Sequence, residues 1–161
     1  MKSTPPLSSW EPTPLTGLVE LYRDEYVCIL VEPKGPLVRL VRSELRFPSR
    51  AVLEATYQGV LATLARHGQE GRFLLTDMRA APGRNDPWFE DAMREIRPRL
   101  FRGFVRLSVL VSTNVGALQL DRISKEDGID RLVSTDEAAI FEYLKSGSLP
   151  RASKRGGPPS R

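Results

Sequence analysis

The side chains that most often carry out chemistry are few in this sequence. His67 is its only histidine and Cys28 its only cysteine. His67 falls in the last turn of an expected helix, where a polar or cationic side chain suits the helix dipole, and Cys28 falls inside an apolar strand. A catalytic triad or a zinc site needs more partners than these two residues supply. The sequence therefore predicts no enzyme activity, no metal and no cofactor, and it contains no phosphate-binding glycine motif.

Polar side chains instead gather where two expected strands end. One group follows the apolar run 73–76, and a second follows the alternating run 105–111. In open α/β sheets, ligands bind beyond the carboxyl ends of the strands, and two helix N-termini at that edge favour an anion. The candidate ligand- or partner-binding residues are Asp77, Arg79, Arg84, Asn85, Asp86, Thr113, Asn114, Gln119 and Arg122.

Most of these residues also have an ordinary structural explanation, which the sequence favours. Asp86 and Thr113 suit the N-cap positions of two helices. Asp77 is expected to pair with a nearby arginine such as Arg79 or Arg84. Gln119 and Arg122 are one helical turn apart and suit a solvated face.

A basic cluster with interleaved phenylalanines provides a further hypothesis. Five arginines lie close together with Glu95 as the only acid, and they could contact nucleic acid or an acidic protein. A solvated helix face with both phenylalanines turned toward the core is the favoured interpretation. The cluster consists of Arg94, Arg97, Arg99, Arg102 and Arg106, with Phe101 and Phe104.

The elements that position these residues follow from short apolar runs and stop signals. Strands are expected at 18–22, 27–31, 37–41, 73–77, 105–111 and 129–133, and the unbroken run 27–31 suits a strand covered on both faces. Ser49 and Gly68 bound a helix, Asp86 and Pro87 begin a second, and Thr113 and Gly128 bound a third. Pro98 is expected to kink the second helix or end it early.

The last helix is expected to begin at a capping box formed by Ser134 and Glu137. Strand–helix alternation over 72–133 implies parallel strands with right-handed crossovers. The predicted fold is α/β, a mixed sheet of five or six strands, antiparallel at first and then parallel, with four helices.

Charge separates the ends of the chain from its middle. The 161 residues hold 24 Lys+Arg and 20 Asp+Glu, a net charge of +4. Residues 1–16 form an expected flexible proline-rich arm, and residues 147–161 a disordered basic tail that carries four bases and no acid. The expected domain, 17–146, is therefore neutral. The tail could make a weak electrostatic contact with RNA, DNA or anionic lipid. The sequence predicts no membrane span, and a cytoplasmic location is expected.

Three segments resemble a known group of proteins. The strand and loop from Leu75 to Pro87, the segment from Val109 to Gln119, and the closing Asp136-Glu137-Ala138-Ala139 followed by Tyr143-Leu144 resemble bacterial SpoIIAA-like proteins of the STAS superfamily. This resemblance implies a regulatory module that acts by protein–protein interaction. Antagonists of that group switched by phosphorylation carry a Ser or Thr where this chain reads Arg84-Asn85-Asp86-Pro87, so a kinase-controlled switch is not expected.

Two alternatives stay open beside the protein-binding hypothesis. Relatives with a lipid-transfer-like arrangement imply a carrier or sensor of a small apolar or anionic ligand. A pocket of several hundred Å³ would favour that alternative, whereas a filled core would favour a protein partner. An uncharacterised enzyme is the second alternative, and turnover lost on changing Asp77 or Arg79 would support it.

Overall fold

The computed structural model describes residues 17–83 and 86–147. They form a six-stranded mixed sheet with strand order β1-β2-β3-β4-β5-β6, together with four helices. The strands are β1 (Val19–Arg23), β2 (Val27–Val31), β3 (Leu37–Arg42), β4 (Phe73–Asp77), β5 (Arg106–Leu110) and β6 (Leu132–Ser134). The helices are α1 (Arg50–His67), α2 (Pro87–Phe101), α3 (Asn114–Asp127) and α4 (Glu137–Ser146).

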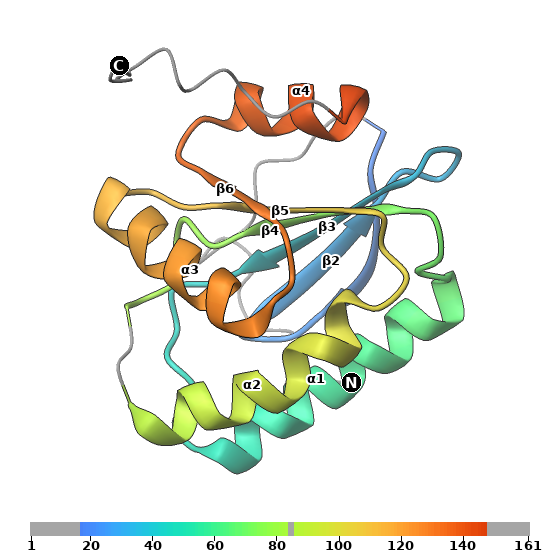
Figure 1. Cartoon of the computed structure of the whole chain (residues 1–161). Helices are drawn as coiled ribbons and strands as arrows, with labels where there is room; N and C mark the ends of the chain where they lie inside the picture. The colour runs from blue at the N-terminus through green and yellow to red at the C-terminus, as the bar shows by residue number, and fades with distance from the viewer. Residues whose placement is uncertain (1–16, 84–85, 148–161) are drawn as a thin grey trace, which may run out of the picture.

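The predicted fold class is confirmed. Strands β1, β2 and β3 pair antiparallel, and β3, β4, β5 and β6 pair parallel. A helix connects each of the parallel pairs, as short crossovers require. In Figure 1, α1, α2 and α3 lie on one side of the sheet and α4 on the other. The predicted arm at 1–16 and the tail beyond Gly147 lie outside the described residues.

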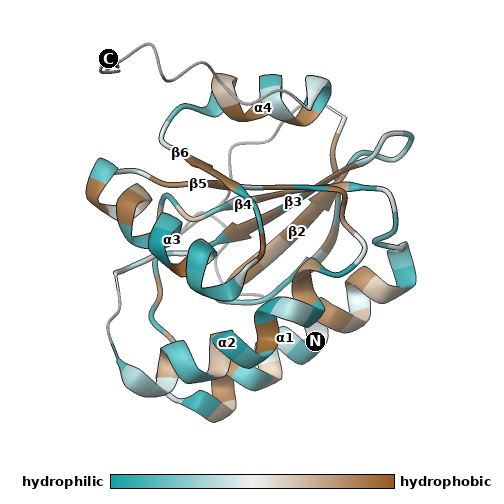
Figure 2. Cartoon of the chain, viewed as in Figure 1, coloured by the Kyte–Doolittle hydropathy of each residue, from teal (hydrophilic) through white to brown (hydrophobic). Residues whose placement is uncertain are grey.

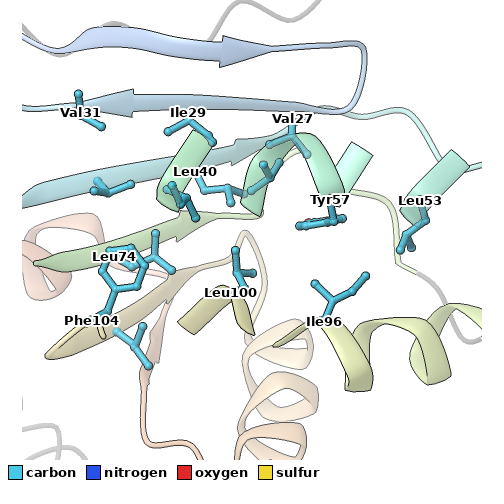
Figure 3. Packing of buried hydrophobic residues seen from close by; sticks show 14 of the residues in the cluster. Val27, Ile29, Val31, Leu40, Leu53, Tyr57, Leu74, Ile96, Leu100 and Phe104 are labelled. Atoms are coloured by element: carbon cyan, nitrogen blue, oxygen red, sulfur yellow. The ribbon is translucent and has the colours of Figure 1, made fainter. Parts of the chain in front are cut away.

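The main core lies between the sheet and helices α1 and α2. Every residue of β2 is buried, which agrees with a strand covered on both faces. Alternate residues of this strand, Val27, Ile29 and Val31, point to the α1 side and pack there with Leu40 of β3 and Leu74 of β4 (Figure 3). Figure 2 shows hydrophobic strands at the centre and helices of mixed character around them. A smaller core joins α4 to the opposite face of the sheet.

Local signals fix most helix ends. Ser49 caps α1 by accepting a hydrogen bond from the amide of Val52. Thr113 caps α3 by accepting from the amide of Gly116. Gly128 ends α3 with φ +72°, a left-handed conformation that favours glycine. Asp86 occupies the N-cap position of α2, but its side chain makes no capping hydrogen bond.

The predicted capping box at Ser134 is wrong. Ser134 belongs to β6, and the N-cap of α4 is Asp136, whose carboxylate accepts from the amides of Ala138 and Ala139. The Asp136 carboxylate thus accepts hydrogen bonds from two free amides in the first turn of α4. Glu137, at the first helical position, is not needed as a capping residue. Gly147 is the C-cap of α4, so the folded domain extends one residue into the predicted tail.

Pro98 does not end α2. The helix continues to Phe101, and Pro98 itself is exposed. The missing amide hydrogen therefore lies on the solvent side of the helix. Leu100 beyond it is buried in the main core, and this packing holds the last turn in place.

Strands β5 and β6 are shorter than expected. Strand β5 begins at Arg106, and Val105 before it is 59% exposed. Strand β6 covers only Leu132–Ser134, because it pairs with just Ser108, Val109 and Leu110 of β5. Sequence alternation alone does not show how far a partner strand extends.

Candidate functional site

A cavity of about 370 Å³ lies between the sheet and helices α2 and α3. Thr76 of β4 and Val109 of β5, which are neighbours in the parallel register, form part of its floor. Met93 of α2 and Ile123 of α3 line its walls. Pockets for small molecules range over roughly 300–1,000 Å³, so this cavity is large enough for a small ligand.

Helix α3 forms one wall because its apolar side chains are not packed into the core. Among the described residues, Ser124 is its only buried side chain, and no residue of α3 belongs to the hydrophobic core clusters. Leu120 and Ile123 are half-buried and line the cavity. Helix α1, by contrast, buries six side chains. The hollow therefore takes the place of the packing that an amphipathic helix normally makes with its sheet.

The two loops singled out from the sequence meet at the mouth of this cavity. Pro82 and Gly83 follow β4, Ser112 and Thr113 follow β5, and all four line it. The prediction that both loops lie at the same sheet edge is confirmed, as expected for the carboxyl ends of parallel strands. Gln119 also lines the cavity.

The other candidate residues lie elsewhere. Asn114 and Arg122 are exposed and do not line the cavity, although Arg122 is one helical turn from Gln119. Asp86 lies at the start of α2. Arg84 and Asn85 lie outside the described residues.

Thr76 lines the cavity, and its hydroxyl is buried. The residue is 8% exposed, and its Oγ1 has no hydrogen-bond partner within the described residues. On the neighbouring strand, the hydroxyl of Ser108 instead donates to the carbonyl of Leu74 at 3.1 Å. A buried hydroxyl without a partner is destabilising by about 1–3 kcal/mol. This oxygen has almost no accessible surface, so other atoms of Thr76 line the cavity.

A buried charge cluster forms one end of the cavity. Arg97 of α2 donates from Nε to Asp127 and from Nη2 to Glu90, each at 2.6 Å. Arg131 donates to the same Asp127 carboxylate at 3.3 Å. Arg97, Glu90 and Arg131 line the cavity. The cluster links α2 to the C-terminal end of α3 through ion pairs shielded from water.

Burial affects the two arginines of this cluster differently. Burial opposes the charge of Arg97, but the hydrogen bonds to Asp127 and Glu90 outweigh it and raise the pKa of the guanidinium. Burial lowers the pKa of Arg131 despite its contact with Asp127. Nη1 of Arg97 makes no hydrogen bond with any described residue, so this group retains a free donor.

Asp77 and Arg79 lie on the opposite face of the sheet from Thr76. Asp77 accepts hydrogen bonds from Arg39 of β3 at 2.9 Å and from Nη2 of Arg79 at 2.8 Å. Both arginines also contact Glu137, at 3.0 Å from Arg39 and 3.4 Å from Arg79. The expected pairing of Asp77 with Arg79 is confirmed. This cluster joins the first turn of α4 to the sheet.

The pKa of Asp77 reflects this environment. Burial alone would raise it, but hydrogen bonds from the side chain and main chain of Arg79 and from Arg39 outweigh burial, and the pKa lies below its ordinary value of 3.8. Asp77 is therefore a charged structural group at neutral pH. An acid–base role would require a pKa closer to neutrality.

The basic cluster from the sequence does not form one surface. Arg97 is buried beside the cavity, whereas Arg106 donates to the carbonyl of Leu144 at the end of α4 and lies over the ring of Phe73. Arg94 pairs with Asp91 on the exposed face of α2. The interpretation of the whole cluster as a solvated face is thus wrong for Arg97, and Phe104 is buried as expected.

His67 and Cys28 lie outside the cavity. Burial lowers the pKa of His67, and its Nε2 atom is buried with no hydrogen-bond partner within the described residues. Burial raises the pKa of the Cys28 thiol to about 12. In the described ranges, no group of three or more histidine, cysteine or acidic side chains could hold a metal ion. No helix in the same ranges is long and apolar enough to cross a bilayer.

Sequence reasoning missed several residues that form the two ion-pair clusters or line the cavity. Arg39 was one arginine within an apolar strand, and such an interruption is a usable sign of a buried ion pair. Arg97 was hidden among exposed arginines of the same helix. Leu120 and Ile123 gave no signal, because apolar residues at helical spacing look the same whether they pack against a sheet or face a cavity.

Comparison with known proteins gives no further guide to this site. No family model matches the chain. No curated protein and no solved structure shows a significant match either. The resemblance to SpoIIAA-like proteins stays a prediction from the sequence.

Proposed function

We propose that this protein is a non-enzymatic binding module that holds a small, largely apolar molecule between β4, β5, α2 and α3. The observation that carries the proposal is the cavity of about 370 Å³ beneath α3. A pocket of this size favours a carrier or sensor over a module with a filled core. A ligand would cover the side chains of Leu120 and Ile123, which the sheet leaves half-buried.

The positions of the reactive side chains also favour binding over catalysis. The cavity is lined by neither His67 nor Cys28. Asp77 and Arg79 are held in an ion-pair cluster on the other face of the sheet. The polar residues that line the cavity carry hydroxyl, guanidinium, carboxylate and amide groups, which can orient a ligand.

A neutral fluorophore tests the proposal. N-phenyl-1-naphthylamine fluoresces more strongly in an apolar site than in water, and its emission should rise with the wild-type chain. Ile123→Trp should abolish this rise by filling the cavity, whereas the matched variant Asp121→Trp places the same ring on the exposed side of α3 and should keep it. Circular dichroism would check the fold of each variant.

A second measurement covers the case in which Ile123→Trp does not fold. The methyl resonances of Leu120 and Ile123 in the wild-type protein should shift on titration with the same fluorophore. A fluorescence rise without such shifts, or an equal rise with a folded Ile123→Trp variant, would place the fluorophore elsewhere and refute the proposal.

Docking of a protein partner is a second candidate function, favoured by one observation. Val115 and Leu118 are 74% and 68% exposed and lie one turn apart on α3. Exposed apolar side chains beside the cavity mouth suit a regulatory interface. A partner bound by the wild-type chain should be lost with Leu118→Glu and kept with Lys125→Glu, which alters an exposed residue near the end of the same helix. Equal retention by both variants would exclude this surface.

A further inference from the structure

One apolar cluster of the sheet includes no described residue from a helix. Cys28 and Leu30 alternate along β2 with the residues that point to α1, so they lie on the opposite face. Val41 of β3 pairs with Cys28 and belongs to the same cluster, together with Leu18. Helix α4, on this side of the sheet in Figure 1, contacts β5 and β6 and packs in a separate cluster. We call Leu18, Cys28, Leu30 and Val41 the back patch.

The strand residues of the back patch are nevertheless shielded from water. Cys28 is 0%, Leu30 8% and Val41 6% exposed. Within the described ranges, Leu18 is the only partly buried hydrophobic residue packed against these three. Arg23, which lies opposite Cys28 on the edge strand β1, has a side chain that is only 11% exposed. An antiparallel sheet face in contact with water normally carries polar side chains, so these apolar, shielded ones indicate a covered face.

The chain enters the described fold beside this patch. Leu18 packs against it, and Gly17 lies in a turn with φ +91°, a conformation that favours glycine. Residues 1–16 therefore join the fold where the patch begins. A chain of this length spans at most about 50 Å, whereas three neighbouring strands are about 10 Å across. The segment is long enough to cross the patch of its own chain.

The composition of residues 1–16 suits a sheet face better than a sheet edge. Four of these residues are proline, which has no amide hydrogen to donate to the free edge of β1. Proline-rich segments adopt the extended polyproline II conformation and bind through their side chains. The apolar side chains available for such contacts are Leu7, Trp10 and Leu15. The segment also has no net charge, so an apolar face is its fitting partner.

We propose that residues 1–16 dock on the back patch of their own chain, with Leu7, Trp10 and Leu15 as the apolar contacts. The docked segment shields the thiol of Cys28 and closes this face to other proteins. This position replaces the flexible arm that composition alone predicts. The inference does not depend on the proposed function, because the cavity lies on the opposite face of the sheet.

The reactivity of Cys28 tests the proposal in the full-length chain. One variant replaces the three apolar side chains of the segment, as Leu7→Ser, Trp10→Ser and Leu15→Ser. Its native thiol should react with 5,5′-dithiobis(2-nitrobenzoate) about tenfold faster than that of the wild type, because the apolar contacts that hold the segment are lost.

A matched control changes three polar residues of the same segment. It carries Thr4→Ala, Ser8→Ala and Thr13→Ala and should label as slowly as the wild type. The methyl resonances of Leu30 should shift in the serine variant and not in the control. Those of Ile140, in the core beneath α4, should stay in place in both, which distinguishes an uncovered patch from general unfolding.

Nuclear Overhauser effects in the wild type identify the occupant directly. Protons of Leu7, Trp10 or Leu15 should give such contacts to the methyls of Leu30 or Val41, and this measurement also decides the question if the serine variant does not fold. In a mixture of isotope-labelled and unlabelled chains, contacts within one chain support the proposal. Contacts only between chains would show that a second copy supplies the segment and would overturn docking on the same chain. Absence of all these contacts, or equal labelling of Cys28 in the wild type and a folded serine variant, would overturn it as well.

Discussion

The guanidinium of Arg39 on β3 lies 2.9 Å from the carboxylate of Asp77 on β4, with both side chains more than nine-tenths buried. The two residues are on adjacent parallel strands and on the same face of the sheet. Arg39 also reaches Glu137 at 3.0 Å. A buried arginine is tolerated in this apolar strand because two carboxylates surround it, and the same contacts place the first turn of α4.

Removing the charge of Asp77 should destabilise the protein strongly. Asp77→Asn leaves the Arg39 guanidinium buried opposite a neutral amide, and the free energy of unfolding should fall by about 3 kcal/mol. Urea denaturation measures this change. Asp91→Asn, which removes an exposed pair with Arg94, should change the same quantity by less than about 0.5 kcal/mol. Equal effects of the two variants would contradict the role assigned to the buried pair.

Acid should weaken the fold partly through Asp77. The pKa of this carboxyl is below 3.8 in the folded protein, so the unfolded chain takes up its proton first as the pH falls. The stabilisation is fully present above about pH 5 and is lost as the pH decreases through the folded pKa. Unfolding free energies measured from pH 6 to pH 2 should therefore fall more steeply for the wild type than for Asp77→Asn. Parallel curves would refute this assignment.

The single thiol should be inert in the native protein. Cys28 is fully buried, and burial raises its pKa to about 12, so little thiolate forms at pH 8. A disulfide reagent such as 5,5′-dithiobis(2-nitrobenzoate) should react with Cys28 only after denaturant is added. In the Cys28→Ala background, Ser112→Cys introduces an exposed thiol that should react at once. Rapid labelling of native Cys28 would show that its strand opens readily.

The single histidine should titrate below its ordinary range. Burial, assisted by the positive charge of Arg72, lowers the pKa of His67 from 6.5. Its ring resonance is the only histidine signal of the natural sequence, so an NMR titration can follow it without ambiguity. The midpoint should lie below 6.5 in the folded protein and return to about 6.5 in urea. A folded midpoint above 6.5 would indicate an acidic neighbour in place of burial.

Much of the fold could be predicted because its signals are local. The run 27–31 and the cap–stop pairs Ser49 with Gly68 and Thr113 with Gly128 mark elements through neighbours in the chain. The errors arose where distant contacts decide. Ser134 pairs with Leu110 of β5, so the cap of α4 falls on Asp136, and Leu100 packs against the core beyond Pro98. Local patterns do not contain these contacts.

The candidate site was predicted in part for the same reason. The topology of parallel strands brings the loops with Pro82 and Thr113 to one edge, and this could be foreseen. The alternation of side chains along β4 then placed Asp77 in the ion-pair cluster on one face of the sheet and Thr76, quoted only within a motif, beside the cavity on the other.

The sequence by itself determined the α/β class, the order of strands and helices, and the balance of charge between the domain and its ends. These properties depend on periodicity, capping residues and composition, which can be read directly from the amino-acid sequence. Only the tertiary structure decided that α3 covers a hollow, that Arg97 is buried and that Thr76 has no partner among the described residues. Burial and unsatisfied hydrogen bonds depend on what surrounds a side chain in space, and those neighbours come from segments far apart in the sequence.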